Sequence, residues 1–424
     1  MESSGPLNFG QHHHVGQDPS RSQKWRSWLY IGLMIFAAAT AGWVIWWAAE
    51  VTTSQQVQLA EASDSASRVA VAPAPAKATE APHITTEVVV TGRENVWDVG
   101  FLPDKTMLFT ERKGVLTVVK DGQTHELAKI NDVRAVGEGG LMGLAVDPKF
   151  SENRYIYTCL NTTHGDIRVL RWKVSADATT LEDRTDVITG IPQNSSGRHS
   201  GCRLSFGPDD YLWVVTGDSA QNDTIPQNPK SLGGKVLRVD REGKAAASGN
   251  LGGNFDSRIF SYGHRNLQGI AFFAKPVNGV LGLTVEHGSY QDDEVNVLTT
   301  GNFGWSPGVG YNELGIPMTD KARFPEAIDA AWSSGNPTIA PSGATILKGK
   351  QWKLWEGWLA MAVLKGAQLR LLEFTDKNAF VRDEILFKNE FGRLRTAVLG
   401  PDNVLYLTTD NGKNSDKIIR VIPN

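Results

Sequence analysis

One strand–turn–strand pattern recurs along the chain and restricts the fold more than any other sequence feature. A representative copy is "RLSFGPDDYLWVVTGD", in which two apolar, strand-like runs flank a Gly-Pro-Asp-Asp turn. Copies of the pattern begin at Asn95, Gly143, Arg203, Gly269, Ser342 and Arg395. Repetition at spacings of roughly 50–75 residues is typical of an architecture in which similar units pack side by side.

These units predict an all-β fold, a six-bladed β-propeller over residues 85–424. Each unit has about 60 residues, which suits a four-stranded blade with one functional loop. The strand-like segments "TEVVV" near residue 86 and "KIIRVIP" near residue 417 are expected to share one blade and close the ring. An irregular β-sandwich is the alternative, and it explains six similar units less well.

An apolar segment near the N-terminus is long enough to cross a membrane as a helix. No charged residue occurs between Ser27 and Ala49, whereas Arg21, Lys24 and Arg26 lie just before this segment. Basic residues stay on the cytoplasmic side. The pattern therefore predicts a cytoplasmic tail (1–26), a single-pass inner-membrane anchor (27–49) and a periplasmic remainder.

A cleaved signal peptide is the alternative, because "ATA" at 39–41 has the small-x-small form of a cleavage site. The apolar run continues beyond that site, which favours an uncleaved anchor. Residues 50–84 are rich in Ala, Pro and Ser and show no apolar periodicity, so we expect a flexible linker there. With 43 basic and 46 acidic residues the net charge is −3, which gives no sign of a nucleic-acid partner.

A histidine and an aspartate stand at the two ends of one predicted hairpin. His199 lies among small residues where the first strand begins, and Asp218 follows the second strand. Two antiparallel strands bring such positions together, and a carboxylate that orients a histidine makes it a better base. His199 is therefore a candidate catalytic base. A structural role at a strand entrance is the alternative.

Several cationic and amide side chains occupy comparable blade entrances. They are Arg265, Asn266, Gln268, Lys365, Arg393 and Arg395. We expect Arg393 and Arg395 to share one strand face, because they are two residues apart. Together these residues predict a cationic channel mouth for a ligand with several carboxylates or phosphates. For Arg265 alone, an ion pair between blades is an equally good interpretation.

The segment "EHGSYQDDEVN" combines a glycine turn with the acidic run Asp292, Asp293 and Glu294. Calcium accepts carboxylates, backbone carbonyls and waters in flexible combinations, so this turn is a candidate calcium site. The segment lacks EF-hand spacing, and a solvated acidic turn is the alternative.

The sequence resembles a known family, the soluble glucose and sorbosone dehydrogenases. Its aldose sugar dehydrogenases use pyrroloquinoline quinone (PQQ) and calcium on a six-bladed propeller. The similar blocks follow in order from "GEGGLMGLAVDPKF" through "GRHSGCRLSFGPD", "YGHRNLQG", "EHGSYQDDEVN", "GNFGW" and "APSG" to "GRLRTAV". The resemblance covers nearly all of residues 85–424.

The resemblance implies a role for each candidate residue. His199 would remove the proton from the anomeric hydroxyl, Asp218 would support it, and Arg265 would polarise a quinone oxygen. Cofactor contacts would come from Asn266, Gln268, Lys365, Arg393 and Arg395. Calcium at the cofactor would be bound by the Gly288 and Ser289 carbonyls, with Asp293 holding waters. Glu294 and the Phe303 carbonyl resemble part of a second calcium site.

Two departures from the family pattern stand out. Glu138 occupies a cofactor-facing place where glutamine is common, and its charge is expected to weaken binding of an anionic cofactor. Cys202 stands where glycine is usual, and Cys159 is the other cysteine of the chain. An extracytoplasmic compartment permits a disulfide between them, whereas two buried thiols are the simpler interpretation.

The resemblance thus predicts a membrane-anchored quinoprotein dehydrogenase that oxidises aldose sugars to lactones and passes electrons to a membrane quinone or a cytochrome. One alternative is a calcium-dependent propeller sugar lactonase, which has no need of a cationic mouth. Another is a non-catalytic binding module, against which the set His199, Asp218 and Arg265 argues.

Overall fold

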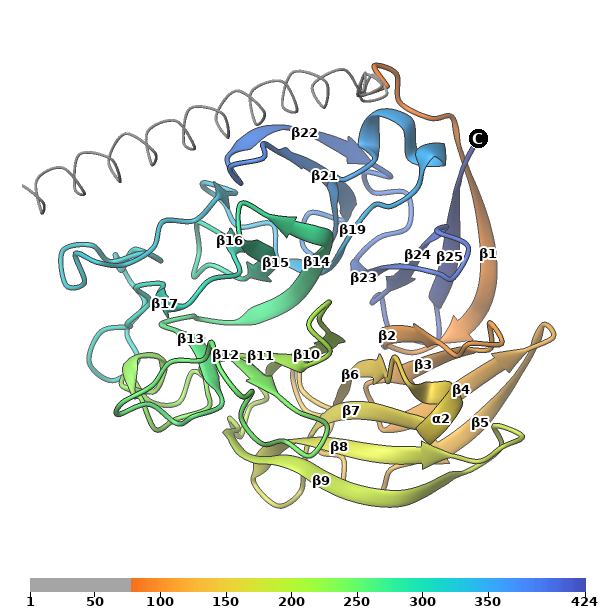
Figure 1. Cartoon of the computed structure of the whole chain (residues 1–424), viewed down its shortest axis with the longest axis horizontal. Helices are drawn as coiled ribbons and strands as arrows, with labels where there is room; N and C mark the ends of the chain where they lie inside the picture. Colours follow the sequence, from red (N-terminus) through yellow and green to blue (C-terminus); the bar gives the residue numbers. More distant parts are fainter. Residues whose placement is uncertain (1–77) are drawn as a thin grey trace, which may run out of the picture. The chain divides into compact units, whose positions relative to one another are not determined.

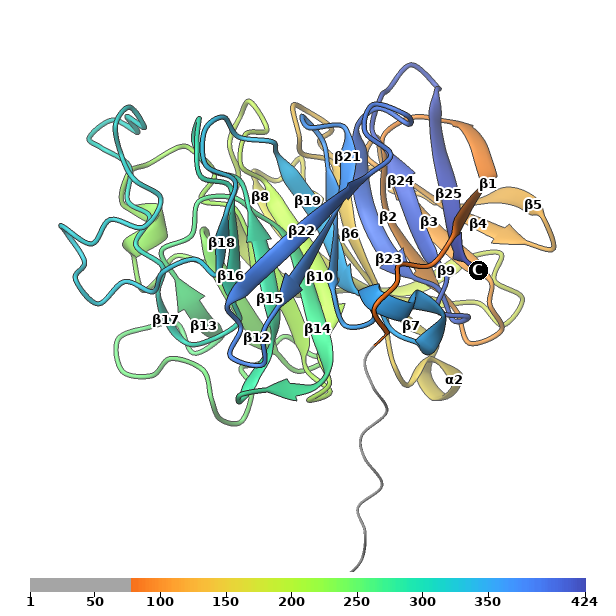
Figure 2. The same cartoon turned by 90° about the horizontal axis from the view of Figure 1, so that it is seen from above.

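The computed structural model of this protein describes residues 78–424, which form six β-sheets arranged around a central axis (Figure 1). Within each sheet the main strands run antiparallel, and one short strand, β17, pairs in parallel with β13. Seen from above, the strands run from one face of the ring to the other and loops emerge at both faces (Figure 2). The prediction of an all-β six-bladed propeller is confirmed.

The first three blades follow the chain from its second strand onward. Blade 1 contains β2 (Val96–Phe101), β3 (Met107–Glu111), β4 (Val115–Lys120) and β5 (Gln123–Lys129). Blade 2 contains β6 (Leu141–Val146), the short helix α2 (Phe150–Asn153), β7 (Tyr155–Asn161), β8 (Asp166–Val174) and β9 (Leu181–Pro192). Blade 3 contains β10 (Gly201–Phe206), β11 (Leu212–Thr216), the 3-10 turn η1 (Ile225–Gln227), β12 (Lys235–Val239), β13 (Ile259–Tyr262) and β17 (Gly301–Asn302).

The remaining blades complete the ring. Blade 4 contains β14 (Leu267–Val277), β15 (Val280–Glu286), β16 (Glu294–Val297) and β18 (Trp332–Ser333). Blade 5 contains β19 (Pro341–Ile346), the 3-10 turn η2 (Lys350–Trp355), β20 (Leu359–Val363), β21 (Gln368–Phe374) and β22 (Phe380–Leu386). Blade 6 contains β23 (Leu394–Leu399), β24 (Leu405–Thr409), β25 (Asp416–Pro423) and, as its outer strand, β1 (Ile84–Arg93).

The ring is closed by the first and last strands of the described chain. β1 pairs antiparallel with β25 in a register that runs from Ile84 opposite Pro423 to Arg93 opposite Asp416. The backbone N–H of Asn424 extends the pairing, because it donates to the His83 carbonyl at 2.8 Å. The closure expected from the two terminal strand-like segments is confirmed.

Each recurring sequence unit forms the two innermost strands of one blade. Neighbouring inner strands pack against each other all the way round the axis, in the order β2, β6, β10, β14, β19, β23 and back to β2. Glycine is required where they approach most closely. A Cβ at Gly143 would lie 2.6 Å from the Cys202 carbonyl oxygen, and one at Gly269 would lie 2.5 Å from the Ser342 carbonyl oxygen. Larger residues at these positions would push the blades apart.

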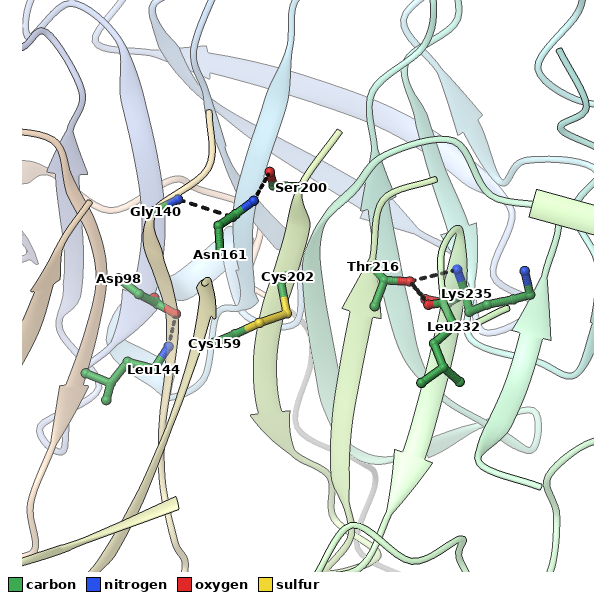
Figure 3. The surroundings of a disulfide bond; sticks show 10 residues. All are labelled: Asp98, Gly140, Leu144, Cys159, Asn161, Ser200, Cys202, Thr216, Leu232 and Lys235. Atoms are coloured by element: carbon green, nitrogen blue, oxygen red, sulfur yellow. Dashed lines mark hydrogen bonds between the residues drawn. A yellow bond between two sulfur atoms is a disulfide. The ribbon is translucent and has the colours of Figure 1, made fainter. Parts of the chain in front are cut away.

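A disulfide joins blade 2 to blade 3 (Figure 3). Cys159 lies in β7 and Cys202 lies in β10, with 6.1 Å between their Cα atoms. Both residues are fully buried. The interpretation of two separate buried thiols is therefore wrong. Because Cys202 follows His199 by three residues, the bond fixes the strand entrance that carries the candidate base.

Among residues 78–424 no helix is long and apolar enough to span a membrane. The predicted anchor at 27–49 lies outside the described residues, as do the predicted tail at 1–26 and most of the predicted linker.

Removing the disulfide should lower the free energy of unfolding. For a Cys159→Ser/Cys202→Ser variant we expect a loss of about 2–4 kcal/mol, because the bond limits the freedom of the unfolded chain between residues 43 apart. Denaturant unfolding of the variant and of wild type, with and without reductant, measures this loss. Equal midpoints for variant and oxidised wild type would contradict the prediction.

Candidate active site

His199 lies just before β10, where its backbone and that of its neighbours pack closely against other segments of the chain. Its side chain is buried and its backbone has φ of 50°, a left-handed conformation that is strained for a residue other than glycine. Gly197 precedes it, and a Cβ there would lie 1.7 Å from the Val136 carbonyl oxygen. A Cβ at Gly217, on the other end of the hairpin, would lie 2.0 Å from the His199 carbonyl oxygen. The glycines therefore let this strained entrance form.

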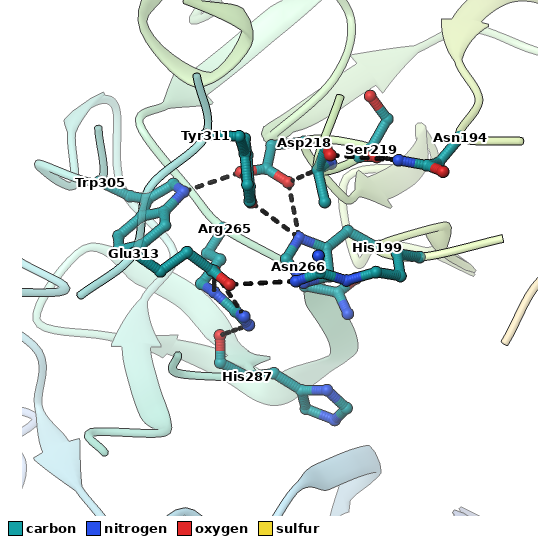
Figure 4. Close-up of polar contacts among 12 residues, drawn as sticks. Asn194, His199, Asp218, Ser219, Arg265, Asn266, His287, Trp305, Tyr311 and Glu313 are labelled. Atoms are coloured by element: carbon teal, nitrogen blue, oxygen red, sulfur yellow. Dashed lines mark hydrogen bonds and ion pairs between the residues drawn. The ribbon is translucent and has the colours of Figure 1, made fainter. Parts of the chain in front are cut away.

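His199 is held by a network of buried polar groups (Figure 4). Its Nδ1 lies 2.8 Å from Asp218 Oδ1. The other oxygen, Asp218 Oδ2, accepts hydrogen bonds from the Trp305 Nε1 at 2.8 Å and from the Tyr311 hydroxyl at 2.6 Å. Burial alone would raise the pKa of Asp218, but His199, the Tyr311 hydrogen bond and Arg265 hold it below its usual value. Asp218 is therefore an ionised carboxylate.

The charge of Asp218 fixes the tautomer of His199. A carboxylate only accepts hydrogen bonds, so the proton of the neutral imidazole lies on Nδ1. Nε2 then carries the lone pair, and it makes no hydrogen bond to any residue in the range 78–424. His199 lines a cavity, which gives this nitrogen the geometry of a base. The hairpin prediction that joined His199 to Asp218 agrees with this arrangement.

The cavity lies at the mouth of the central channel and has a volume of about 320 Å³. Its walls come from the loops before β6, β10, β14, β16 and β19, and they consist of Glu138, Arg198, His199, Arg265, Asn266, His287, Gly288, Ser289, Asp293, Thr338 and Ala340. Most of these side chains are polar or ionisable. The cavity is therefore suited to a charged or heavily hydroxylated ligand.

A larger cavity of about 580 Å³ lies at the other end of the inner strands. It is lined mainly by apolar strand residues and by the Pro-containing turns that join inner strands. Among its buried charges, Asp98 and Arg203 pair with each other at 2.6 Å, and Asp147 pairs with Arg241 at 2.9 Å. We place the candidate site at the His199 end, because ionisable side chains from several loops gather there beside a carboxylate-oriented histidine.

Arg265 lines the same cavity and is positioned by three contacts. Its Nε and Nη2 each lie 2.7 Å from Glu313 Oε1, and its Nη1 donates to the His287 carbonyl at 3.1 Å. Burial would lower the pKa of Arg265, but Glu313 holds it above the ordinary value. The ion pair expected as an alternative is present, and it holds the guanidinium at the cavity wall.

The remaining predicted cations do not line the cavity, and only Lys365 contacts a residue that does. Arg395 is buried and donates to Gln268 Oε1 at 3.2 Å and to Asp410 Oδ2 at 2.6 Å. Arg393 stands before β23, is exposed, and donates to the Asp410 carbonyl at 3.2 Å. Lys365 Nζ is exposed and contacts Thr338 Oγ1 at 3.2 Å. Carboxylates therefore offset part of the cationic mouth that the sequence predicts.

Glu138 points into the site and is bound by the amides predicted to hold a cofactor. It accepts hydrogen bonds from the backbone N–H of His199, from Asn266 Nδ2 at 3.2 Å and from Gln268 Nε2 at 3.3 Å. Burial raises the pKa of Glu138, but its interactions with His199, His287 and the Asn266 amide bring it below its usual value. The Glu138 carboxylate is therefore ionised, and it points into the site.

The predicted calcium turn presents oxygen atoms that have no partner within the described chain. No residue of 78–424 donates a hydrogen bond to the Gly288 or Ser289 carbonyl, and the buried Ser289 Oγ is also unpaired. Asp293 closes this turn by accepting from the backbone N–H groups of Gly288 and Ala340, both at 2.9 Å. An all-oxygen donor set beside a buried carboxylate fits calcium. No cluster of three metal-binding side chains occurs in this part of the chain, so such a site would rest on carbonyls.

Glu294 lies in a different environment from Asp293. It accepts a hydrogen bond from Asn296 Nδ2 at 3.2 Å and one from Thr319 Oγ1 at 3.3 Å, and it is buried close to Glu286. Burial and the charge of Glu286 raise its pKa well above the usual range. Phe303, the other residue of the predicted second calcium site, stacks on His264 with ring centroids 4.4 Å apart.

Sequence reasoning missed three residues of this site. Tyr311 and Glu313 come from the long connection between β17 and β18, and Trp305 from the start of that connection. The only signal was an aromatic and an acidic residue beside the glycines of "GVGYNELG". Because the path of a loop is not encoded in periodicity, their contacts with residues about a hundred positions away were not predictable.

Fold and site together define a six-bladed propeller whose polar cavity contains a carboxylate-oriented histidine and a buried arginine. Comparison with known sequences gives the family. The Glucose / Sorbosone dehydrogenase profile matches residues 93–420, and the chain belongs to that family. The resemblance seen in the sequence blocks is confirmed.

Individual relatives agree with this assignment. The chain is 28% identical to "Aldose sugar dehydrogenase YliI" of Escherichia coli, over 80% of this chain and 93% of the relative. It is 26% identical to "Quinoprotein glucose dehydrogenase B" of Acinetobacter calcoaceticus, over 74% of this chain and 83% of the relative. The PQQ-bound aldose sugar dehydrogenase of Streptomyces coelicolor superposes with a TM-score of 0.65 at 28% identity, over 81% of this chain and all of the other.

The ion pair between Asp410 and Arg395 should make stability depend on pH. Burial raises the pKa of Asp410, but Arg395 lowers it to about 2, against about 3.9 in an unfolded chain. A lowered pKa stabilises the fold above the unfolded value, here by about 2–3 kcal/mol, and this is lost as pH falls from about 4 to about 2.

We therefore expect Asp410→Asn to be less stable than wild type at pH 7 by at least about 2 kcal/mol. The difference should shrink as the pH approaches 2. Denaturant unfolding over this pH range measures it, with the exposed Glu390→Gln as the control. A difference that stays constant down to pH 2 would rule out the pair as its source.

Proposed function

We propose that this protein is a PQQ-dependent aldose dehydrogenase that oxidises the anomeric carbon of a sugar to a lactone. The observation that carries the proposal is the pairing of a base with an electrophile in one cavity. His199 presents an unprotonated Nε2, and Arg265 presents a guanidinium held in place by Glu313. Family membership and the PQQ-bound relative support the choice of cofactor.

In the proposed reaction the protein moves one proton and stabilises one charge. His199 Nε2 takes the proton of the anomeric hydroxyl, and the ionised Asp218 stabilises the imidazolium that results. The guanidinium of Arg265 stabilises the negative charge that develops on the acceptor oxygen. When bound, PQQ supplies the two-electron acceptor for the hydride that leaves the anomeric carbon. Loss of this proton and this hydride converts the sugar into its lactone.

The residues present fit a cofactor with three carboxylates. Arg395 carries a buried Nε with no hydrogen-bond partner in the described chain, and it lies directly behind Gln268. A buried donor without an acceptor favours an anion within reach. We propose that the cofactor is held by Arg395 together with two groups of the cavity wall and five further donors. The wall groups are Glu138 and His199, and the donors are Arg265, Asn266, Gln268, Lys365 and Arg393.

We further propose that calcium binds at the turn of Gly288 and Ser289, with Asp293 holding its waters. The unpaired carbonyl oxygens and Ser289 Oγ support this site. We also propose a second calcium near Glu294 and the Phe303 carbonyl. Glu294 is buried beside Glu286, and two buried carboxylates are costly without a cation, which supports this site.

The location of the enzyme is also part of the proposal. A helix over residues 27–49 would anchor the propeller to the inner membrane with the active site in the periplasm, where electrons pass to a membrane quinone or a cytochrome. The disulfide between Cys159 and Cys202 supports an oxidising compartment. Sugar-dependent oxygen uptake by membranes that contain the protein tests the acceptor. Dye reduction without such uptake would contradict it.

Reconstitution of the full-length chain tests the activity. With PQQ and calcium we expect sugar-dependent dye reduction that falls at least about 1,000-fold in His199→Ala, because the base is lost. Chelation before cofactor addition should abolish it. His164→Ala, an exposed histidine, is the matched control and should keep full activity.

The other outcomes of this test separate the alternatives. Hydrolysis of a sugar lactone without PQQ would favour the calcium-dependent lactonase. Sugar binding with no turnover in the presence of bound PQQ would favour the non-catalytic module.

Replacing Glu138 should strengthen cofactor binding. Because its pKa is lowered, Glu138 keeps its charge near neutral pH and repels an anionic cofactor. For Glu138→Gln we expect the Kd for PQQ to fall about tenfold, which corresponds to about 1.4 kcal/mol. Titration of PQQ absorbance measures it, with Glu126→Gln on the exposed outer strand β5 as control. Weaker binding in Glu138→Gln would show that the carboxylate supports the site instead.

A further inference from the structure

The connection between β17 and β18 carries a short turn whose side chains contact His199, Asp218 and Arg265. Gly308 and Asn312 exchange backbone hydrogen bonds at 2.6 and 3.0 Å, which folds residues 307–315 into a tight loop, here called the 307–315 loop. Tyr311 within it has φ of 62°. A left-handed tyrosine costs about 1–2 kcal/mol and persists only where other contacts hold it.

Tyr311 contacts both the candidate base, His199, and the carboxylate that orients it, Asp218. Its hydroxyl donates to Asp218 Oδ2 at 2.6 Å and lies 2.9 Å from His199 Nδ1, and its ring meets the His199 ring edge to face at 5.9 Å (Figure 4). Burial and the charge of Asp218 raise the pKa of Tyr311, so the hydroxyl stays protonated and remains a donor. Tyr311 therefore fixes the carboxylate that in turn fixes the tautomer of His199.

Glu313, two residues further on, contacts the arginines of the site. Its Oε1 lies 2.7 Å from both Nε and Nη2 of Arg265, and its Oε2 lies 3.0 Å from Nη2 of Arg198. Two nitrogens of the Arg265 fork are thereby directed at one oxygen. Because a guanidinium is planar, this contact and the His287 carbonyl set the direction of its remaining N–H groups.

Apolar burial holds the 307–315 loop only at its first residue, because Pro307 is buried whereas the tip of the loop is exposed. Val309 is 93% exposed and Leu314 is 79% exposed. Besides Tyr311 and Glu313, an anchoring contact comes from the Gly315 N–H, which donates to the Tyr290 hydroxyl at 3.1 Å. The position of the loop therefore depends mainly on its polar contacts with the reacting groups.

We propose that Tyr311 and Glu313 are positioning residues, through which the 307–315 loop holds the base His199 and the electrophile Arg265 at a fixed separation. This inference rests on the proposed dehydrogenase function. It assigns no proton transfer to either residue. Tyr311 acts through Asp218 and His199, and Glu313 acts through Arg265.

Kinetics of full-length variants with PQQ, calcium and an aldose test the proposal. For Tyr311→Phe we expect kcat to fall about tenfold with little change in KM, and the acidic limb of the pH profile to move to higher pH. The shift follows because Asp218 loses a donor and then stabilises the imidazolium more strongly. For Glu313→Gln we expect a similar loss of kcat with a smaller shift of that limb, because the released loop also loosens the Tyr311 contact with Asp218. Val309→Ser, at the exposed tip of the loop, is the control and should behave as wild type.

The double variant shows whether Tyr311 and Glu313 act together through one loop or act independently, each on its own partner. Because either substitution releases the same loop, the loss in Tyr311→Phe/Glu313→Gln should be smaller than the product of the single losses. A fully multiplicative loss, or single variants as active as wild type, would overturn the proposal.

A measurement that needs no catalytic turnover tests the positioning role separately from the proposed dehydrogenase activity. In 15N-histidine-labelled full-length protein we expect a slowly exchanging His199 Nδ1–H resonance, assigned by its absence in His199→Gln. It should exchange at least about tenfold faster in Tyr311→Phe and Glu313→Gln, and be unchanged in Val309→Ser. If wild type shows the resonance but no PQQ-dependent activity, the dehydrogenase function fails and the positioning role stands. If Tyr311→Phe leaves exchange unchanged, the positioning role fails.

Discussion

The antiparallel pairing of β1 with β25 is the constraint on which the rest of the structure depends. In this ring the last blade is completed by a strand from the beginning of the domain, which ties its first and last strands together. The active-site cavity collects groups from several loops around that axis, including Glu138 before β6, His199 before β10 and Arg265 before β14. An open ring would let these groups separate, so closure is a condition for the site as well as for the fold.

Balanced charge is the second feature that organises the site. Arg265 is held by Glu313 and Arg395 by Asp410, while Glu138 is held by amides and a backbone N–H. Burying these cations alone would be costly, and pairing makes them tolerable. The same pairing fixes their directions, which a ring of free lysines and arginines would not achieve. The cationic mouth predicted from the sequence is therefore better described as a set of oriented ion pairs.

Much of the fold and part of the site could be predicted, for physical reasons that differ between residues. The inner hairpins were visible because apolar runs and Pro-Asp turns repeat, and His199 was joined to Asp218 because both lie at ends of one hairpin. The Cys159–Cys202 bond was left open because sequence gives no distance between blades. Tyr311 and Glu313 were missed because their contacts depend on the path of an irregular loop, and the amide partners of Glu138 because they come from another blade.

The pairing that closes the ring also brings the two ends of the propeller together. The hydrogen bond between Asn424 and His83 places the last residue beside the point where the chain enters β1. A short peptide that joined these ends would turn the domain into a continuous loop of blades. New ends could then be opened at an exposed outer turn such as 375–377 without separating any pair of inner strands. The domain is in this sense suited to circular permutation.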